Sequence, residues 1–349
     1  MTLTSVRFPM TPYPNGWYKV AFSDELKAGD VKPLHCFGQE LVLFRTSDGT
    51  PQIFDAYCPH LGAHLGHGGV VKDNALQCPF HGWCFNLEGR CCEVPYTRHN
   101  PRARMKVWPV REINWVVMVY YDADGRSPSW EFPQISELQS DDWVAVKGRD
   151  FVLQSHPQEL LENFVDTAHF AHLHKSVIAS TASLGVSTQG TVLRHKMKAK
   201  NMLGLGASSL STTVSSEYVN SLYGLGFAQT RYQSAEVVGI NLVLNFFITP
   251  VDDNCIVLSQ LILVKKVLCS KLLAKCFTKL LLEKFVNKGL EEDKQMWEQK
   301  AFLSSPALCK EEQPIRQYRN WAKQFYAANT LRPSIQSAVQ PVLERSYKA

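Results

Sequence analysis

The N-terminal third of the chain consists of short apolar runs separated by turn residues, a pattern typical of β-strands. The strongest runs cover residues 41–44, 52–54, 108–110 and 115–121. Ser47-Asp48-Gly49 and Asp122-Ala123-Asp124-Gly125 lie beside them and favour tight turns. The pattern predicts a small all-β domain, followed by a linker at residues 125–133, which are rich in Gly, Ser and Pro.

Beyond the linker, helical and strand-like patterns mix, which predicts an α+β domain. Ser155 and Gln158 have the spacing of a capping box, so we expect a helix to begin at Ser155 and to run to about Ala168. Strand-like runs occupy residues 190–265 and a helical pattern fills residues 268–300. We therefore predict two domains, residues 1–125 and 126–349.

Composition excludes several classes of protein. The 349 residues are 45% hydrophobic and 20% charged, and no stretch of 18 apolar residues indicates a membrane-spanning helix. The N-terminus lacks the basic start and apolar run of a secretion signal, so a cytoplasmic location is expected and the ten cysteines are predicted to be free or metal-bound. A net charge of +5, from 37 basic and 32 acidic residues, is too mild to indicate nucleic-acid binding.

Two short segments each pair a cysteine with a histidine. They are Cys58-Pro59-His60 and Cys78-Pro79-Phe80-His81. Two separate loops can present two thiolates and two imidazoles to one metal centre. A structural zinc site is the alternative. Zinc fingers, however, pair Cys with Cys and His with His. Here each loop offers one cysteine and one histidine, so the two thiolates can bind one iron and the two imidazoles the other. This arrangement favours an iron-sulfur cluster.

With its flanks, this motif resembles Rieske proteins, whose [2Fe-2S] cluster would here be held by Cys58, His60, Cys78 and His81. Respiratory Rieske proteins have a further cysteine in each loop, where this chain has Ala63 and Phe80. The oxygenase type therefore fits better. The nearby thiols are expected to be small buried residues, and these are Cys84, Cys91 and Cys92.

A second candidate metal site lies in the histidine-rich segment 163–174. On one continuous helix Asn163, Asp166 and His169 would share a face, together with Phe170. His174 is about 140° further round than His169, so the helix must bend or end between them if both bind one metal. On helical geometry alone His172 is the rival ligand, and a histidine-rich helix without metal is the alternative. Iron that activates O₂ is typically held by two histidines and one carboxylate.

The carboxylate is expected on the helical segment downstream. Asp293 falls on an apolar stripe whose members recur at steps of three and four residues: Leu282, Val286, Leu290, Asp293 and Trp297. A buried carboxylate needs a metal or an ion-pair partner, so a buried ion pair is the alternative to iron ligation. The neighbouring Glu291, Glu292 and Glu298 are expected to be solvated.

The spacing Asp166-x₂-His169-x₄-His174 resembles that of Rieske non-haem iron oxygenases. This resemblance implies a helix-grip-like α+β catalytic domain with one Fe²⁺, held by His169, His174 and Asp293. It also implies that Asp166 links His81 of a neighbouring subunit to His169. Asp166 and Asn163 are the candidate catalytic residues.

Within that family the chain is most similar to the branch of 3-ketosteroid 9α-hydroxylase and cholesterol 7-desaturase. The matching segments are 55–63, 94–96, 293–300 and 321–326. The resemblance implies a homotrimer, a separate NAD(P)H-dependent reductase with or without a ferredoxin, and O₂-dependent hydroxylation or desaturation of an apolar, sterol-like substrate. A Rieske electron-transfer protein and an oxygenase for O- or N-demethylation are the alternatives.

Two further expectations concern the substrate. Residues 180–250 are predicted to build the pocket, with Leu203, Leu205, Leu222 and Leu225 among its apolar residues. In the downstream helix, Lys271, Lys275 and Lys279 share one face, with Leu273, Phe277 and Leu280 elsewhere around it. A solvated lysine face over a core-packed stripe is the favoured interpretation, and contact with a membrane surface is the alternative.

Overall fold

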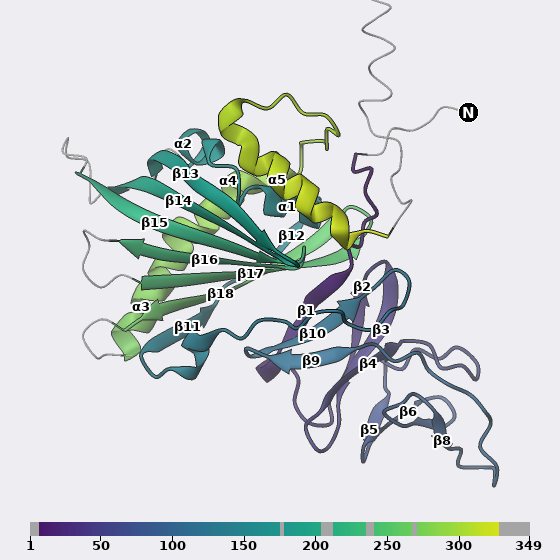
Figure 1. Ribbon diagram of the computed structural model, residues 1–349. Coiled ribbons are helices and arrows are strands. Elements are labelled where there is room, and N and C mark those ends of the chain that lie inside the picture. Colours follow the sequence, from purple (N-terminus) through teal and green to yellow (C-terminus); the bar gives the residue numbers. More distant parts are fainter. Residues whose placement is uncertain (1–6, 175–177, 204–211, 235–240, 267–270, 328–349) are drawn as a thin grey trace, which may run out of the picture. The chain divides into compact units, whose positions relative to one another are not determined.

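The computed structural model describes residues 7–174, 178–203, 212–234, 241–266 and 271–327 (Figure 1). The chain divides into two compact units. The smaller unit comprises Asn15–Gln134 and the short segment Thr249–Asp253, and the larger unit comprises the remaining described residues. None of the helices in these ranges is long and apolar enough to cross a membrane.

The smaller unit is built from strands, as predicted. It contains three antiparallel sheets with the orders β1-β10-β9, β2-β3-β4 and β5-β6-β7-β8. The strands are β1 Gly16–Phe22, β2 Val31–Cys36, β3 Gln39–Arg45, β4 Pro51–Asp55, β5 Val70–Lys72, β6 Ala75–Gln77, β7 Cys84–Phe85, β8 Cys91–Glu93, β9 Val110–Ile113 and β10 Val116–Tyr121. The run predicted at 108–110 is wrong, because β9 begins only at Val110. The Trp108 N–H instead donates to the Ile53 carbonyl oxygen at 3.0 Å.

The core of the smaller unit includes both cysteines of the first motif. Cys58 and Cys78 are buried among side chains that come from β3, β4 and β7, which include Val42, Phe44, Phe54 and Phe85. Burial of apolar surface in this cluster therefore also encloses the two loops that carry the motif.

The larger unit contains one antiparallel sheet of eight strands. Its order is β11-β18-β17-β16-β15-β14-β13, and β12 pairs with β18 beside β11. The strands are β11 Trp143–Lys147, β12 Phe151–Leu153, β13 Ile178–Gln189, β14 Val192–Leu203, β15 Thr212–Tyr223, β16 Phe227–Ser234, β17 Asn241–Asp252 and β18 Cys255–Lys265. The predicted onset of strands at 190 misses β13. Within the predicted range, the apolar sequence 241–248 forms most of β17.

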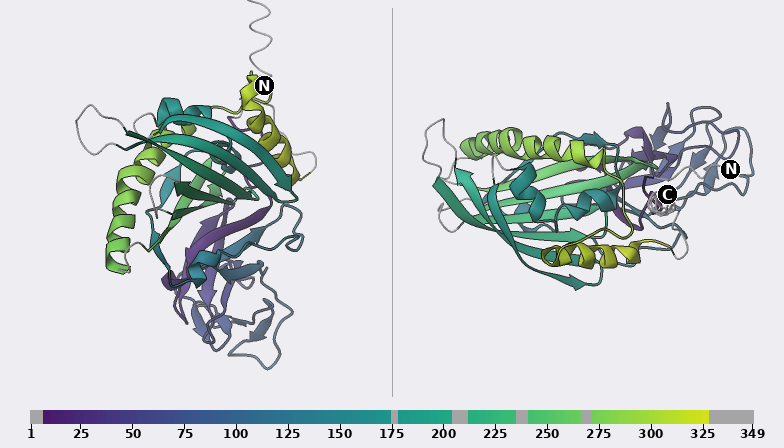
Figure 2. Two further views of the ribbon diagram at one scale, coloured as in Figure 1. Left: turned by 60° about the vertical axis from the view of Figure 1, so that its left-hand side comes forward. Right: turned by 90° about the horizontal axis from the view of Figure 1, so that it is seen from above.

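Within the described part of the larger unit, five α-helices accompany this sheet. They are α1 Pro157–Glu162, α2 Ala168–Leu173, α3 Lys271–Leu281, α4 Asn287–Trp297 and α5 Gln313–Ala322. Seen from above, α1 and α2 lie between the α3–α4 run and α5 (Figure 2). The apolar core joins residues of α1, α4 and α5 to the sheet, and both Leu222 and Leu225 are fully buried in it.

The capping box predicted at Ser155 is wrong. The N-cap of α1 is His156, whose Nδ1 accepts a hydrogen bond from the Gln158 N–H at 3.1 Å. Complete burial lowers the pKa of His156 to about 4, so the ring is neutral and its Nε2–H donates to the Thr11 carbonyl oxygen at 3.0 Å. Pro157 occupies the first helical turn, where its missing N–H costs nothing.

The helical pattern predicted at 268–300 is confirmed over the described residues. Helices α3 and α4 are joined by a π-helical segment, Leu282–Val286. Leu282, Leu290 and Trp297 are buried, so the predicted apolar stripe is confirmed, and Asp293 is only 7% exposed. In α3 the predicted core-packed stripe of apolar residues is wrong for Leu273 and Leu280, which are exposed. The buried positions of this helix are Ala274 and Thr278. The side chains of Lys271 and Phe277 lie outside the described part.

Candidate metal centres

The two loops of the first motif have the same backbone hydrogen-bond pattern. The Cys58 N–H donates to the Ala63 carbonyl oxygen at 2.9 Å, and the Gly62 N–H donates back to Cys58 at 2.9 Å. In the second loop, Cys78 bonds Trp83 in the same sense at 2.8 Å and Gly82 donates to Cys78 at 3.1 Å. Gly62 and Gly82 have φ values of 74° and 72°, which glycine adopts at no steric cost. The sequence thus folds both loops into one type of turn.

These turns bring the two histidines of the motif together. The rings of His60 and His81 lie 4.7 Å apart, and His60 stacks on Trp83 at 4.4 Å. Burial raises the pKa of Cys58 to about 11, although a hydrogen bond from the His60 backbone partly offsets it. A bound metal would therefore have to displace the thiol proton, which is usual for thiolate ligands. Apolar side chains around the loops are exposed, namely Tyr57, Leu61, Phe80 and Tyr96.

The other thiols near the motif differ from one another. Cys84 is buried, Cys91 is half-buried and Cys92 is exposed. The expectation of three small buried thiols is therefore wrong for Cys92, which lies at the solvent side of β8.

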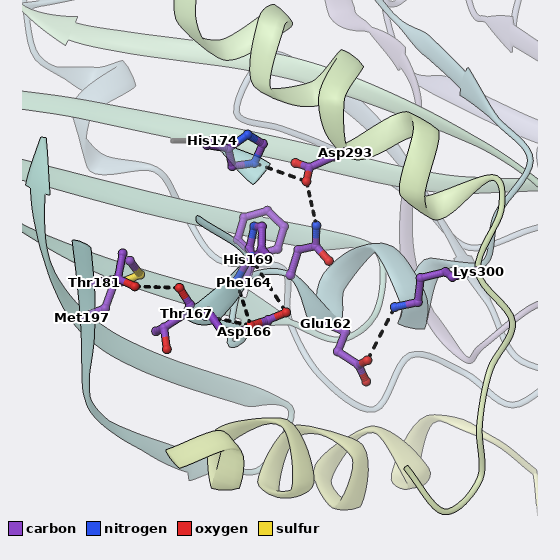
Figure 3. A network of polar contacts seen from close by, with 12 residues as sticks. Glu162, Phe164, Asp166, Thr167, His169, His174, Thr181, Met197, Asp293 and Lys300 are labelled. Carbon is purple, nitrogen blue, oxygen red and sulfur yellow. Dashed lines mark hydrogen bonds and ion pairs between the residues drawn. The ribbon is translucent and has the colours of Figure 1, made fainter. Parts of the chain in front are cut away.

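In the larger unit the structure brings His169, His174 and Asp293 together. One ligand atom from each lies within 4.8 Å of the other two (Figure 3). His174 Nε2 is 3.2 Å from Asp293 Oδ1, and that oxygen also accepts a hydrogen bond from Asn163 Nδ2 at 3.1 Å. His172 is exposed and points to no partner in this group. Two imidazoles and one carboxylate converging on one point are a donor set suited to iron.

The backbone between Asn163 and Ala168 is not helical, so the single helical face predicted for Asn163, Asp166 and His169 is wrong. Helix α1 ends at Glu162, α2 begins at Ala168, and α2 ends before His174, which is its C-cap. The predicted break between His169 and His174 is thus confirmed. Asp166 Oδ1 accepts the Ala168 N–H at 2.9 Å and the His169 N–H at 3.3 Å.

Asp166 also faces the ring of His169. Its Oδ2 lies 3.6 Å from His169 Nδ1, a buried ring nitrogen that has no hydrogen-bond partner among the described residues. Burial disfavours the charged carboxylate, but the His169 ring and the two backbone N–H groups outweigh it and lower the pKa of Asp166. Asp166 is therefore an anion that fixes the start of α2 and faces the far side of a metal-site imidazole.

Glu292 is a site residue that the sequence reasoning missed. It was expected to be solvated, yet its Oε2 lies 2.8 Å from His174 Nδ1. Burial opposes protonation of His174, but the hydrogen bonds and charges of Asp293 and Glu292 outweigh it and raise the pKa of His174. Glu298 is also not simply solvated, since it accepts the Gln154 N–H at 3.0 Å.

Side chains of the sheet hold the broken segment between α1 and α2. The Phe164 carbonyl oxygen accepts Asn220 Nδ2 at 2.7 Å and His195 Nδ1 at 2.9 Å, and the Thr167 carbonyl oxygen accepts Thr181 Oγ1 at 2.6 Å. Burial lowers the pKa of His195, so the neutral ring donates from Nδ1 and accepts from Ser183 at Nε2. Figure 3 shows part of this network.

A cavity opens onto His169 and Asp293. Most of its lining is apolar and comes from α1, α2, the turn between them, the sheet and α4. These apolar residues are Leu160, Phe164, Phe170, Met197, Leu244, Phe246, Leu258, Leu290 and Trp297. Its other polar side chains are Asn163, Tyr218, Asn220 and Thr230. The predicted range 180–250 does contribute to the lining, but Leu222 and Leu225 belong to the core, and Leu205 and the side chain of Leu203 lie outside the described residues.

Comparison with known families decides what this arrangement is. Residues 16–112 match the Rieske [2Fe-2S] domain, and residues 119–326 match the 3-ketosteroid 9α-hydroxylase C-terminal domain. The chain belongs to the Rieske oxygenase family. The oxygenase is 33% identical to cholesterol 7-desaturase nvd 1 of Ciona intestinalis, over 93% of this chain and 71% of that protein. It is 28% identical to the oxygenase component of 3-ketosteroid-9α-monooxygenase of Mycobacterium tuberculosis, over 90% and 82%.

Solved structures of low sequence identity share the fold of the oxygenase. Dicamba monooxygenase bound to dicamba superimposes with a TM-score of 0.72 at 16% identity, over 90% of this chain and 98% of that one. NdmA of Pseudomonas putida CBB5 gives a TM-score of 0.70 at 20% identity, over 88% and 89%. The predicted fold class, an all-β Rieske domain followed by an α+β catalytic domain, is confirmed.

Family membership also confirms the cofactors. A Rieske oxygenase component carries a [2Fe-2S] cluster and a mononuclear Fe²⁺, and it takes O₂ and electrons from a reductase. The chain offers a fitting site for each. Two buried cysteines and two adjacent histidines suit the cluster. Asp293 is buried between Leu290 and Trp297 on α4, and among the described residues its ion-pair partner is the His174 ring.

Proposed function

We propose that the oxygenase hydroxylates or desaturates a steroid or sterol at iron held by His169, His174 and Asp293. The observation that carries this proposal is the convergence of these three ligand groups on an apolar cavity. In the same proposal Cys58, His60, Cys78 and His81 hold the cluster. When bound, the cluster supplies single electrons and the iron binds and activates O₂.

The surrounding residues position these ligands. Glu292 accepts the Nδ1–H of His174 and leaves Nε2 free to face Asp293, while Asn163 fixes one carboxylate oxygen of Asp293. Asp166 faces Nδ1 of His169 and so leaves the other ring nitrogen for a metal. Such outer partners fix the tautomer and orientation of metal-binding histidines. Asp166 and Asn163 thus act in this proposal by holding the ligands.

The substrate class rests on the lining of the cavity. Nine of its lining residues are apolar, including the aromatic residues Phe164, Phe170 and Phe246, and such a wall favours a substrate with a large apolar surface. Relatives that match more than nine-tenths of the chain are named cholesterol 7-desaturases, which supports a sterol or steroid. Hydroxylation and desaturation use the same ligands, so both reactions belong to the proposal.

The partners follow from the oxygenase class. We infer a separate NAD(P)H-dependent reductase, with or without a ferredoxin, and a homotrimer in which Asp166 of one subunit approaches His81 of the next. The exposed apolar side chains Tyr57, Leu61 and Phe80 beside the cluster loops support a protein contact at that surface. A cytoplasmic location is part of the same proposal.

The deciding experiment compares Asp293→Ala with Glu291→Ala. Glu291 is two residues away on α4 and forms an exposed ion pair with Arg149, so it is a matched control. We expect Asp293→Ala to keep the Rieske absorption and spin-resonance signals but to lose one iron per chain and all substrate oxidation, whereas Glu291→Ala keeps both. Unchanged iron content in Asp293→Ala would refute the ligand assignment.

The substrate is tested by incubating sterols and steroids with the holoenzyme, a surrogate reductase and ¹⁸O₂. A product that contains ¹⁸O indicates hydroxylation, and a product two hydrogens lighter without ¹⁸O indicates desaturation. Oxidation of methoxy or N-methyl compounds in place of sterols would favour a demethylase. If no substrate is oxidised while the cluster still turns over with a partner, an electron-transfer protein is the correct function.

A further inference from the structure

Helix α3 exposes apolar side chains along its outer side. The small buried residues Ala274 and Thr278 seat the helix on the sheet, where it contacts β11 and β18. On the opposite side Leu272 is 72% exposed and Leu280 is 55% exposed, with the exposed Cys276 between them. These three residues are four positions apart, so they form one ridge along the helix. We call Leu272, Cys276 and Leu280 the leucine ridge.

Lysines accompany the leucine ridge, and α3 itself contains no acidic residue. Lys275 and Lys279 are exposed on α3, and the π-helical segment that follows exposes one acid and one base, Glu283 and Lys284. From Asn254 to Leu282 the sequence contains no Asp or Glu, and it contains five lysines: Lys265, Lys266, Lys271, Lys275 and Lys279. A helix that is solvated on its outer side usually carries polar residues there. This one combines leucines with positive charge.

We propose that α3 docks the oxygenase on an anionic lipid surface. The leucine ridge would enter the boundary between headgroups and acyl chains, and Lys275 and Lys279 would face the anionic headgroups, as in interfacial amphipathic helices. The positive charge argues against a second copy of this chain as the occupant, because two such helices would bring lysines against lysines. The ridge is convex, whereas apolar partner helices are normally received in a groove.

The position of α3 connects this surface to the cavity. Leu282, the first residue after α3, is buried in a small cluster with Ile262 and Val264, and Leu244 packs against that cluster. Leu244 also lines the cavity. A helix resting on lipid would therefore lie one side-chain layer from the cavity wall. The benefit of that position, access to a lipid-dissolved substrate, rests on the proposed function; the docking itself does not.

The test measures binding of the holoenzyme to vesicles by flotation. Vesicles of phosphatidylcholine with 30% phosphatidylserine are compared with pure phosphatidylcholine vesicles at low and high salt. The variants are Leu272→Gln with Leu280→Gln, and Lys275→Gln with Lys279→Gln. Leu184→Gln with Lys198→Gln is the matched control. These two residues are exposed on strands β13 and β14 of the same unit, away from α3 in the sequence. Circular dichroism and iron content establish that each variant is folded.

We expect the oxygenase to float with the anionic vesicles at low salt. Each lysine removed should weaken this binding about fivefold, and each leucine about tenfold. High salt should abolish the effect of the lysines but not that of the leucines. Equal binding to neutral and anionic vesicles, no binding at all, or equal losses in the control would overturn the proposal. So would a change in the number of subunits in the leucine variants, which would make the ridge a contact between protein chains. No outcome of flotation depends on turnover, so failure to oxidise sterols leaves this test unaffected.

Discussion

Glu292 offers the sharpest test of how the iron site is held. Its Oε2 lies 2.8 Å from His174 Nδ1, and its side chain is 29% exposed. Because the carboxylate fixes the ring, we expect Glu292→Ala to weaken iron binding by about 10- to 100-fold, which corresponds to about 1.4–2.7 kcal/mol. Glu292→Gln keeps an acceptor oxygen but loses the charge, so this variant should weaken iron binding by only about 10-fold.

The assay is competition for Fe²⁺ between the protein and a chelator of known affinity, with the Rieske spin-resonance signal as an internal count of folded chains. Glu291→Gln is the control, because Glu291 is the adjacent carboxylate on α4 and forms an exposed ion pair with Arg149. Substrate oxidation at saturating iron should recover in Glu292→Gln more than in Glu292→Ala. If Glu292→Ala binds iron as tightly as the wild type, the carboxylate does not orient His174.

Two other perturbations test the remaining structure. Asn220→Leu leaves the buried Phe164 carbonyl with one donor fewer and should destabilise the larger unit by about 1–3 kcal/mol, whereas the exposed control Thr188→Val should not; thermal unfolding measures both. In the smaller unit, hydrogen bonding to Asp252, opposed by burial and aided by Glu40, raises the pKa of His35. A raised pKa stabilises the fold below the unfolded value of about 6.5, and this stability is lost as pH rises through the folded pKa. His35→Gln should therefore lower the temperature at which the Rieske absorption disappears at pH 6 but not at pH 9, by a small amount because the pair is partly exposed.

The candidate ligand residues could be picked out from the sequence because their signals are local. Each cysteine–histidine pair lies within four residues, and His169 and His174 are five apart. The same holds for Asp293, which helical periodicity places on the buried stripe. Glu292 could not be predicted in this way. Its partner His174 is 118 residues away, so its role depends on how α4 packs against the end of α2.

The fold was predictable at the level of its class and less so at the ends of its elements. The capping box at Ser155 fails because a tertiary contact competes with it: His156 is held by Thr11, far away in the sequence, and caps the helix itself. The exposure of Leu273 and Leu280 has a different cause. Positions four apart drift by about 40° per step on an α-helix, and the π-helical segment resets that drift between α3 and α4. The buried stripe of α4 is therefore continued in α3 by Ala274 and Thr278, and Leu273 and Leu280 lie outside it.

The polar residues inside the sheet follow from the spacing of the two histidines. Two histidines five residues apart cannot share a face of one helix. For both to face Asp293, α2 has to end before His174, and the preceding turn is broken as well. A broken helix leaves carbonyl groups without their usual partners, and when buried they need other donors. Strands β13, β14 and β15 supply one donor each, in Thr181, His195 and Asn220. The buried polar groups of the sheet are therefore a structural consequence of the ligand spacing, and replacing them should disturb the segment that carries Asp166 before it disturbs the sheet.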